Sequence, residues 1–400
     1  MTRAADRKAM GHGVAIIGAG MARHGYRLDM GWRDLIAEAG EKAIADAGID
    51  RARVSGGLVS VTCPEAFEQQ NLGPLAAEEL GLSSGPFAQV VGACAGGTMA
   101  FMHGVNMIRS GQSECVLVAG VEKLSDIYSV SDALLSYPDQ DFESPAGFDY
   151  VDTMALMHAR YMQKYNVSAE DVAAFAVADR WYAARNPNAI DYRRPALAIE
   201  EIMTSGWASR PITRAECARG CDGASALILM RDDLCRRGER AVAVAGVSAA
   251  TGPNGMGAKF RKGQDDDISE AVPTRDAAAR AFAEAGITAG DVSVAQVHDC
   301  FSVMGSLHLE GLGLFPRGEA ARAVAAGETA LGGTCPTNTD GGRIGLGHPT
   351  GATGVSIICE TVSQLRGEAG ERQVKDATVG VAQSMGGNNA LSAVAVFRNH

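Results

Sequence analysis

A short internal repeat constrains the fold of this 400-residue chain more than any other feature. Residues 43–49 (AIADAGI) recur at 281–287 as AFAEAGI, and each copy ends an amphipathic helical pattern at a glycine. Each copy also leads within a few residues into an apolar, strand-like run. A similar spacing pairs residues 114–120 with 376–383. The chain is therefore predicted to contain two similar α/β halves that pack together.

Between these halves the composition changes. Residues 122–222 are richer in Tyr, Met, Asp, Pro and Arg, and they are predicted to form an inserted loop domain. The N-terminal half is then expected at 1–121 plus 223–240, and the C-terminal half at 241–400. Strand-like runs alternate with helical patterns in both halves. These runs are 13–18, 57–62, 87–91 and 115–121 in the first half, and 241–247, 292–297, 377–382 and 390–397 in the second.

Composition and charge exclude several classes of protein. With 46% hydrophobic residues and 49 glycines, the chain suits a large α/β protein with many turns. A net charge of −11 without a basic cluster argues against a nucleic-acid partner, because phosphate binding needs concentrated Lys and Arg. No apolar run is long enough to span a bilayer, and the first residues lack a signal-peptide core. We expect a cytoplasmic protein without a membrane partner.

The nine cysteines point away from disulfides and metals. They are an odd number scattered along a long chain, which does not make a disulfide framework. No CxxC pair occurs, so no metal site is expected.

Cys94 stands where a catalytic cysteine is expected. It follows the strand-like run 87–91 and precedes a small-residue helix start at 95–98. Unpaired N–H groups and the positive dipole end of a helix favour a thiolate over a thiol there. Taken alone, the position suits a buried structural cysteine equally well.

Two motifs far along the chain favour catalysis. Residues 296–301 (QVHDCF) end an apolar strand, and residues 338–354 (NTDGGRIGLGHPTGATG) form a glycine-rich loop that carries His348 just before an apolar helix. A nucleophilic cysteine, a histidine in a glycine-rich turn and a second cysteine beside a histidine make an acyl-transfer set.

Together these motifs resemble the thiolase superfamily, and specifically its sterol-carrier-protein branch. Members of that branch show HDCF where other thiolases show an Asn-Glu motif, and GHPxGATG around the catalytic histidine. Residues 154–175 and 221–224 (CDGA) are similar to the family's loop-domain helix and SDGAA string, so the resemblance covers nearly the whole chain. It implies an α/β, thiolase-like fold of two pseudo-repeated halves in a five-layered αβαβα arrangement, with an inserted loop domain.

The resemblance also implies catalytic roles. Cys94 would carry the acyl group as a thioester, and neutral His348 would take the Cys94 proton. His298 with a water would stabilise an enolate oxygen, and the backbone N–H groups of Cys94 and Gly386 would form a second oxyanion hole. The structural alternatives are that His348 caps a glycine-rich turn and that His298 is a satisfied core histidine.

One departure from ordinary thiolases assigns the acid/base group. Most members carry a second catalytic cysteine in a CxGGG string, where this chain has Ser384. A hydroxyl has too high a pKa to exchange protons with an α-carbon near neutrality. In the branch that this chain resembles, Cys300 of HDCF would supply the acid/base thiol. The structural alternative is that Cys300 is a small, buried apolar residue without a catalytic role.

The expected substrates are acyl-CoA and CoA, with no bound cofactor. Ser248 resembles the family residue that contacts the pantetheine arm, and His158 lies in the loop-domain helix near the expected acyl pocket or in its core. A basic group follows Ser248, and aromatic residues of the loop domain are expected to shape the pocket. The basic group is Lys259, Arg261 and Lys262. The aromatic residues are Tyr128, Tyr137, Phe142 and Phe148.

Two functions remain open at this stage. The chain is predicted to be a thiolase, an acetyl-CoA C-acyltransferase that performs Claisen condensation of acyl-CoAs or thiolytic cleavage of 3-ketoacyl-CoA. The alternative is a thiolase-like acyltransferase or aldolase subunit that works with a small OB-fold or zinc-ribbon partner. The short apolar strand at 88–91 is predicted to pair in a homodimer, because an edge strand would otherwise be exposed.

Overall fold

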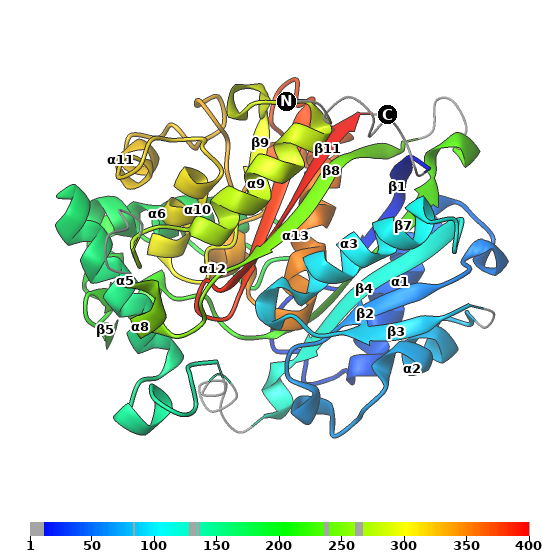
Figure 1. Cartoon of the computed structure of the whole chain (residues 1–400), viewed down its shortest axis with the longest axis horizontal. Coiled ribbons are helices and arrows are strands. Elements are labelled where there is room, and N and C mark those ends of the chain that lie inside the picture. Colours follow the sequence, from blue (N-terminus) through cyan, green and yellow to red (C-terminus); the bar gives the residue numbers. More distant parts are fainter. Residues whose placement is uncertain are drawn as a thin grey trace, which may run out of the picture.

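The computed structural model of the chain, drawn in Figure 1, describes residues 12–82, 85–127, 134, 137–235, 240–260 and 267–399. Tyr128, Arg261 and Lys262, which the sequence singled out, lie outside these ranges. Among the described helices, none is both long and apolar enough to cross a bilayer.

The described strands form one large mixed sheet in the order β3-β2-β4-β7-β1-β8-β11-β10-β9. We call the strands from β3 to β1 the N-terminal half and those from β8 to β9 the C-terminal half. The halves meet where Ala15 pairs with Ala243 and Ile16 with Val242. The strands are β1 (Val14–Met21), β2 (Gly57–Ser60), β3 (Phe87–Val90), β4 (Cys115–Lys123), β7 (Asp222–Arg231), β8 (Val242–Thr251), β9 (Val294–Gln296), β10 (Val379–Gly386) and β11 (Leu391–Asn399).

The two halves follow the same plan, as the sequence repeat predicts. In each half a parallel pair of strands (β2 with β4, β9 with β10) continues into an antiparallel pair (β4 with β7, β10 with β11). The repeated heptapeptides end α1 and α9, and Gly48 and Gly286 close these helices with φ 62° in both cases. The helices of the two halves are α1 (Trp32–Ala47), α2 (Leu72–Glu79), α3 (Gly96–Arg109), α8 (Met256–Lys259), α9 (Val272–Ala285), α10 (Ser302–Gly311), α11 (Ala320–Ala325), α12 (Gly342–Leu346) and α13 (Thr350–Leu365).

Helices lie on both sides of the sheet and between its halves, which confirms the five-layered thiolase-like fold. One apolar cluster joins α1 to the outer face of the N-terminal half, and another joins α9 to that of the C-terminal half. A third cluster joins α3 and α13 to strands of both halves. Phe101 of α3 packs on Phe397 of β11 with ring centroids 5.6 Å apart. A Cβ at Gly97 would lie 2.7 Å from the backbone N of Val355, so the two central helices touch at this glycine.

The segment between β4 and β7 leaves the sheet and returns to it, where the sequence predicts the loop domain. Its helix α6 packs on α10, α11 and α12 of the C-terminal half. The division of the chain into separate domains stays a prediction. The elements of this segment are α5 (Tyr150–Tyr165), α6 (Ala169–Ala183), α7 (Ile199–Met203) and the small hairpin of β5 (Trp207–Ser209) and β6 (Ile212–Thr213).

Candidate active site

Three side chains from distant parts of the sequence meet inside the molecule. Ligand-type atoms of Cys94, His298 and His348 all lie within 4.8 Å of one another, and all three residues are buried. The two imidazole rings meet edge to face, with centroids 5.0 Å apart. The fold thus brings together the nucleophile, base and oxyanion donor named from the sequence. Cysteine and histidine are both zinc ligands in proteins, so among the described residues this cluster could also hold a metal ion.

Cys94 lies in a tight turn at the start of a central helix. It is the middle residue of a 3₁₀ turn, η3 (Ala93–Ala95), and α3 begins at Gly96. Ala93 has φ 49°, a left-handed conformation that is strained for alanine and that fixes the direction of the next side chain. The position at a helix start is therefore as expected.

The charge state of Cys94 differs from the expectation. Burial raises the pKa of the Cys94 thiol well above its usual value, and the nearby Cys300, Cys63 and Glu122 raise it further. The expected preference for a thiolate is therefore wrong for the resting site. A thiol that is protonated at rest needs a base to take its proton, which makes the neighbouring imidazole more important.

His348 is held in the tautomer that can act as this base. Thr353 Oγ1 donates its only proton to the Pro349 carbonyl at 3.1 Å, so it accepts from His348 Nδ1–H at 2.7 Å. Nε2 of His348 is therefore the unprotonated nitrogen. Burial, with Arg343 and His24 nearby, lowers the pKa of His348 to about 3, which keeps the ring neutral. A neutral imidazole with a bare Nε2 can accept the Cys94 proton.

Glu122, at the end of β4, holds the turn that carries His348. Its carboxylate accepts from Gly351 N at 2.8 Å and from Thr350 Oγ1 at 2.6 Å, in the first turn of α13. It also accepts from the backbone N of Thr62 at 3.0 Å. The sequence analysis missed this residue. The sequence signal that could have identified Glu122 is an acidic residue directly after the apolar run of β4.

His298 follows β9 and faces the same space. Its backbone N donates to Gln383 Oε1 at 3.0 Å, and neither ring nitrogen has a hydrogen-bond partner among the described residues. Burial and the nearby His348 and His308 lower its pKa well below the usual value, so the ring is neutral. A buried imidazole without a protein partner can donate one N–H to a substrate oxygen. It is therefore not a core histidine satisfied by its neighbours.

Cys300 lies two residues further on, and a tyrosine that the sequence analysis did not name contacts it. Tyr150 Oη is 3.8 Å from Cys300 Sγ and donates to the Gly387 carbonyl at 3.2 Å. Burial raises the pKa of the Cys300 thiol, so this thiol is protonated at rest. Cys300 also raises the pKa of the Cys94 thiol, so the two thiols lie near each other.

Gly386 and Ser384 end β10 in different environments. A Cβ at Gly386 would lie 2.6 Å from the Gly92 carbonyl and 3.3 Å from Ala93 Cβ, so this glycine lies against the Cys94 turn. Ser384 is fully buried, and its hydroxyl donates to Thr98 Oγ1 of α3 at 2.7 Å. That bond turns Ser384 toward the contact of the two central helices.

The residues named for CoA or acyl binding lie outside this cluster. Ser248 faces α9, and Arg280 Nε donates to its hydroxyl at 3.0 Å. His158 is buried in the loop domain among apolar side chains of α5, and neither of its ring nitrogens has a partner in the described part of the chain. Tyr137 packs on Tyr150 with centroids 5.8 Å apart, whereas Phe142 is 80% exposed. The substrate contacts of Ser248 and His158 stay predictions.

A cavity of about 580 Å³ lies beside the glycine loop that follows β10. Lys259 and Asn389 both line it, and Lys259 Nζ donates to the Asn389 carbonyl at 3.3 Å. Burial lowers the pKa of Lys259 to about 8.

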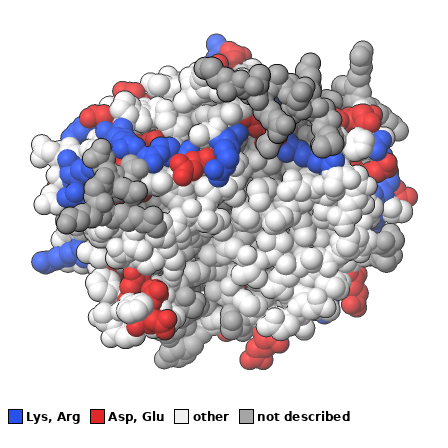
Figure 2. Space-filling model, viewed as in Figure 1, with Lys and Arg blue, Asp and Glu red and all other residues white. Residues whose placement is uncertain are grey.

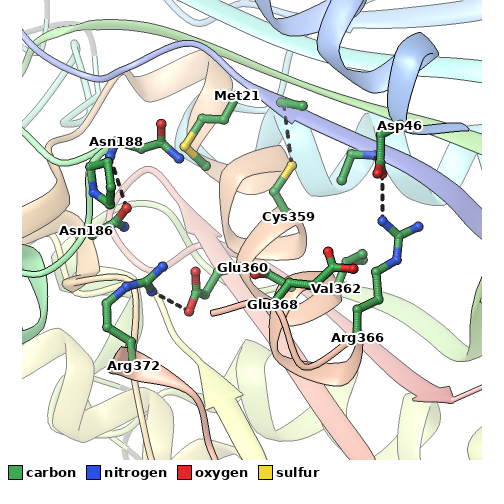
Figure 3. A pocket seen from close by; sticks show the side chains of 14 residues that line it. Met21, Asp46, Asn186, Asn188, Cys359, Glu360, Val362, Arg366, Glu368 and Arg372 are labelled. Atoms are coloured by element: carbon green, nitrogen blue, oxygen red, sulfur yellow. Dashed lines mark hydrogen bonds and ion pairs between the residues drawn. The ribbon is translucent and has the colours of Figure 1, made fainter. Parts of the chain in front are cut away.

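A separate polar pocket of about 310 Å³ does not include the catalytic cluster. Figure 3 shows two arginines on its rim, each turned toward an acid: Arg366 toward Asp46 and Arg372 toward Glu360. These pairs measure 2.6 Å each. The pocket therefore lies where α13 meets α1, with one ion pair joining the end of α13 to α1 and the other joining α13 to the turn that follows it.

The duplicated α/β fold and the buried cluster of one cysteine and two neutral histidines define the thiolase-like class of proteins. Comparison with known families agrees with this class. Residues 14–203 match the family model of the thiolase N-terminal domain, and residues 258–399 match that of the thiolase C-terminal domain-like family. The chain belongs to the thiolase family.

Curated relatives match over most of the chain. It is 35% identical over 386 residues to the acetyl-CoA acetyltransferase of Methanothermobacter thermautotrophicus, covering 96% of this chain and 99% of that protein. It is 29% identical over 396 residues to human sterol carrier protein 2, covering 94% of this chain and 70% of that protein.

Solved structures show the same fold. One chain of the structure described as "Ltp2-ChsH2(DUF35) aldolase" matches with a TM-score of 0.82 at 23% identity, over 98% of this chain and 99% of that chain. The acetyl-CoA acetyltransferase from Syntrophomonas wolfei matches with a TM-score of 0.73 at 20% identity, over 97% of this chain and 100% of that chain.

Proposed function

We propose that this protein is an acetyl-CoA C-acyltransferase that transfers acyl groups through a thioester on Cys94. The convergence of Cys94, His298 and His348 within 4.8 Å carries this proposal. The acetyl-CoA acetyltransferase from Methanothermobacter thermautotrophicus, at 35% identity over nearly the whole of both chains, supports it. Acyl-CoA and CoA are the proposed substrates, without a bound cofactor.

Acylation of the enzyme begins at Cys94. His348 Nε2 takes the thiol proton as the sulfur attacks the carbonyl carbon of an acyl-CoA, because this nitrogen is unprotonated and His348 belongs to the cluster around Cys94. The developing oxyanion then needs donors. The backbone N–H groups of Cys94 and Gly386 are proposed for this role, since Gly386 lies against the Cys94 turn. His348 returns its proton to the leaving CoA thiolate.

Carbon–carbon bond formation or cleavage needs a second proton carrier, and we assign that role to Cys300. In the thiolytic direction its thiol gives a proton to the carbanion of the departing acetyl-CoA. The Cys300 thiolate regains a proton from the thiol of the incoming CoA, which then attacks the Cys94 thioester. His298 donates to the enolate oxygen, for which its unpartnered ring nitrogens are suited.

The cavity beside Lys259 and Asn389 is proposed as the entrance for CoA. It adjoins the loop that follows Gly386, the glycine that lies against the Cys94 turn, and its volume of about 580 Å³ is large enough for part of a pantetheine arm. Lys259 is the one member of the predicted basic group that lies in the described part of the chain. Its ammonium would meet a CoA phosphate or carbonyl there.

Intact-protein mass spectrometry tests the proposed nucleophile. After incubation with acetyl-CoA the wild type should gain one acetyl group. Cys94→Ala should gain none and lose thiolysis, and Cys94→Ser should be nearly inactive, because a serine hydroxyl hardly ionises. Cys335→Ala is the matched control, since Cys335 is equally buried but outside the cluster. An undiminished acetyl adduct in Cys94→Ala would contradict the assignment of Cys94 as the nucleophile.

A homodimer is the proposed assembly. The strand β3 is at the end of the sheet order, and Val91 directly after it is 66% exposed. Figure 2 shows few charged side chains over the part of this face where α3, β2 and β3 lie. An area with few charges beside an open sheet edge suits pairing with a second copy. A monomer by light scattering at micromolar concentration would contradict it.

The alternative is a subunit that needs a small partner with an OB fold or zinc ribbon. The structure described as "Ltp2-ChsH2(DUF35) aldolase" is named as a complex, which keeps this alternative open. The intact cysteine and histidines favour acyl transfer over an aldolase reaction. Thiolysis by the purified chain alone would exclude a required partner, whereas activity that appears only with a co-purifying small protein would establish one.

A further inference from the structure

Tyr150 connects the loop domain to the catalytic pocket. It is the first residue of α5 and is 5% exposed, whereas Asp149, the N-cap residue just before it, is half-buried. Its hydroxyl lies 3.8 Å from Cys300 Sγ and 3.2 Å from the Gly387 carbonyl. One hydroxyl thus touches both the second thiol of the site and the residue after Gly386.

The hydrogen bonds of Tyr150 can be assigned, because a phenol has a single proton. In the resting site that proton points to the Gly387 carbonyl, so a lone pair of the oxygen faces the Cys300 S–H. Once the sulfur has lost its proton, the same O–H can turn from Gly387 to the thiolate. Hydrogen bonds to a charged acceptor are about twice as strong as neutral ones, so this turn is favoured.

Apart from the backbone N–H of Cys300 itself, which lowers its pKa, the other groups named around Cys300 do not stabilise its thiolate. Asp299, on the same strand end, and Cys217, which precedes β7, both raise the pKa of Cys300, and burial raises it most. The hydrogen bond from Tyr150 lowers the pKa of Cys300 and is the strongest side-chain influence in that direction.

The start of α5 also holds the glycine loop in place. Thr153 Oγ1, one turn after Tyr150, lies within hydrogen-bond distance of the Asn388 side chain at 3.1 Å, beside the bond from Tyr150 to Gly387. The Tyr150 ring packs on Tyr137 and Phe301 with centroids 5.8 and 5.9 Å away. These ring contacts survive removal of the hydroxyl, so the hydroxyl can be tested separately from the fold.

We propose that Tyr150 is a positioning residue for proton transfer at Cys300: its hydroxyl holds the Cys300 sulfur in place in the resting site and donates to the sulfur after its proton has left for the substrate carbanion. This inference rests on the proposed role of Cys300 as the acid/base group. The proton itself moves from Cys300 Sγ to the α-carbon and is restored by the thiol of CoA, so Tyr150 ends each cycle with its own proton. It breaks and forms only hydrogen bonds.

The test is hydrogen–deuterium exchange at the methyl group of acetyl-CoA in heavy water. Tyr150→Phe should slow exchange about 10-fold, the effect of losing one hydrogen bond of this kind, and should move the pH profile of exchange to higher pH. Acetylation of Cys94 should keep its rate. In a Cys300→Ala background, Tyr150→Phe should cause no further loss, since both changes remove one function.

Each result has a distinct meaning. If Tyr150→Phe exchanges at the wild-type rate, if it slows Cys94 acetylation equally, or if its effect persists fully without Cys300, the inference is overturned. If Cys300→Ala leaves exchange unchanged, the proposed role of Cys300 fails instead. Tyr182→Phe is the matched control, because Tyr182 is a buried tyrosine of the loop domain on α6, outside the cluster. It should leave both rates unchanged.

Discussion

Arg366, at the end of α13 in the C-terminal half, pairs with Asp46, at the end of α1 in the N-terminal half, at 2.6 Å. Asp46 belongs to the repeated heptapeptide, and its carboxylate also accepts from Ala19 N in β1 at 2.9 Å. One acid thus fixes its own strand and the central helix of the other half.

The second copy of the repeat makes the reciprocal connection. Glu284 of α9 accepts from Val247 N in β8 at 3.0 Å and pairs with Arg109, the last residue of α3, at 2.6 Å. Each outer helix therefore holds the central helix of the opposite half. The two pairs differ in burial: Arg366 is 4% exposed, whereas the side chains of Arg109 and Glu284 are 29% and 36% exposed.

This difference in burial predicts that replacing the acid by its amide lowers the unfolding free energy by different amounts in the two pairs. Asp46→Asn keeps an oxygen for Ala19 N but leaves a buried guanidinium without its charge partner, which should cost about 3 kcal/mol of unfolding free energy. Glu284→Gln breaks a half-exposed pair and should cost about 0.5 kcal/mol. Urea unfolding of both variants measures this. Equal losses would mean that burial does not decide the strength of these pairs.

The duplicated fold could be predicted well from the sequence, because the two copies of the repeated heptapeptide end helices that pack in the same way in both halves. It did not predict β7, whose residues 222–231 (DGASALILMR) contain an apolar run without β-branched enrichment. Such a run fits a buried helix as well as a buried strand. Only its pairing between β4 and β1 makes it a strand.

The candidate site was predicted in part for a similar reason. Cys94, His298 and His348 stand in motifs with their own local signal, and the structure brings them together. Tyr150 and Thr353 act through contacts that form only when the loop domain or the first turn of α13 is in place. The charge state of Cys94 was predicted wrongly because burial, which a helix start does not reveal, outweighs the helix dipole.

Thr353 offers a test of the His348 tautomer. Thr353→Val removes the acceptor of Nδ1–H while keeping the shape of the side chain, so the proton is free to move to Nε2 and block the base. The rate of Cys94 acetylation should fall about 10-fold, the value of one such hydrogen bond. Thr353→Ser keeps the oxygen and should restore most of the rate in stopped-flow assays. Equal rates for the three proteins would contradict this tautomer.

Ser384 should be silent in proton transfer. Its hydroxyl donates to Thr98 Oγ1, which in turn donates to the Gly354 carbonyl at 3.3 Å, so Ser384→Ala removes one link between the central helices. We expect Ser384→Ala to lose about 1 kcal/mol of unfolding free energy. Its rate of deuterium exchange into acetyl-CoA should stay within about two-fold of the wild-type rate, which is on the order of the experimental scatter. Cys300→Ala should instead lose exchange by roughly 10²–10⁴-fold. The opposite pattern would place the proton carrier on β10.

His158 should make the protein less stable in acid. Burial lowers its pKa to about 4 from 6.5, and neither ring nitrogen has a hydrogen-bond partner in the described part of the chain. Below pH 6.5 the unfolded chain therefore binds a proton at His158 that the folded protein does not. Unfolding free energy is lost through this group as pH falls from 6.5 toward 4, by about 3 kcal/mol in total.

His158→Met, which fits the apolar cluster around α5, should be close to wild type at pH 7 and increasingly more stable than wild type toward pH 4. Urea unfolding of both proteins at pH 7, 6, 5 and 4 measures this difference, and a difference independent of pH would show that His158 is protonated equally in both states.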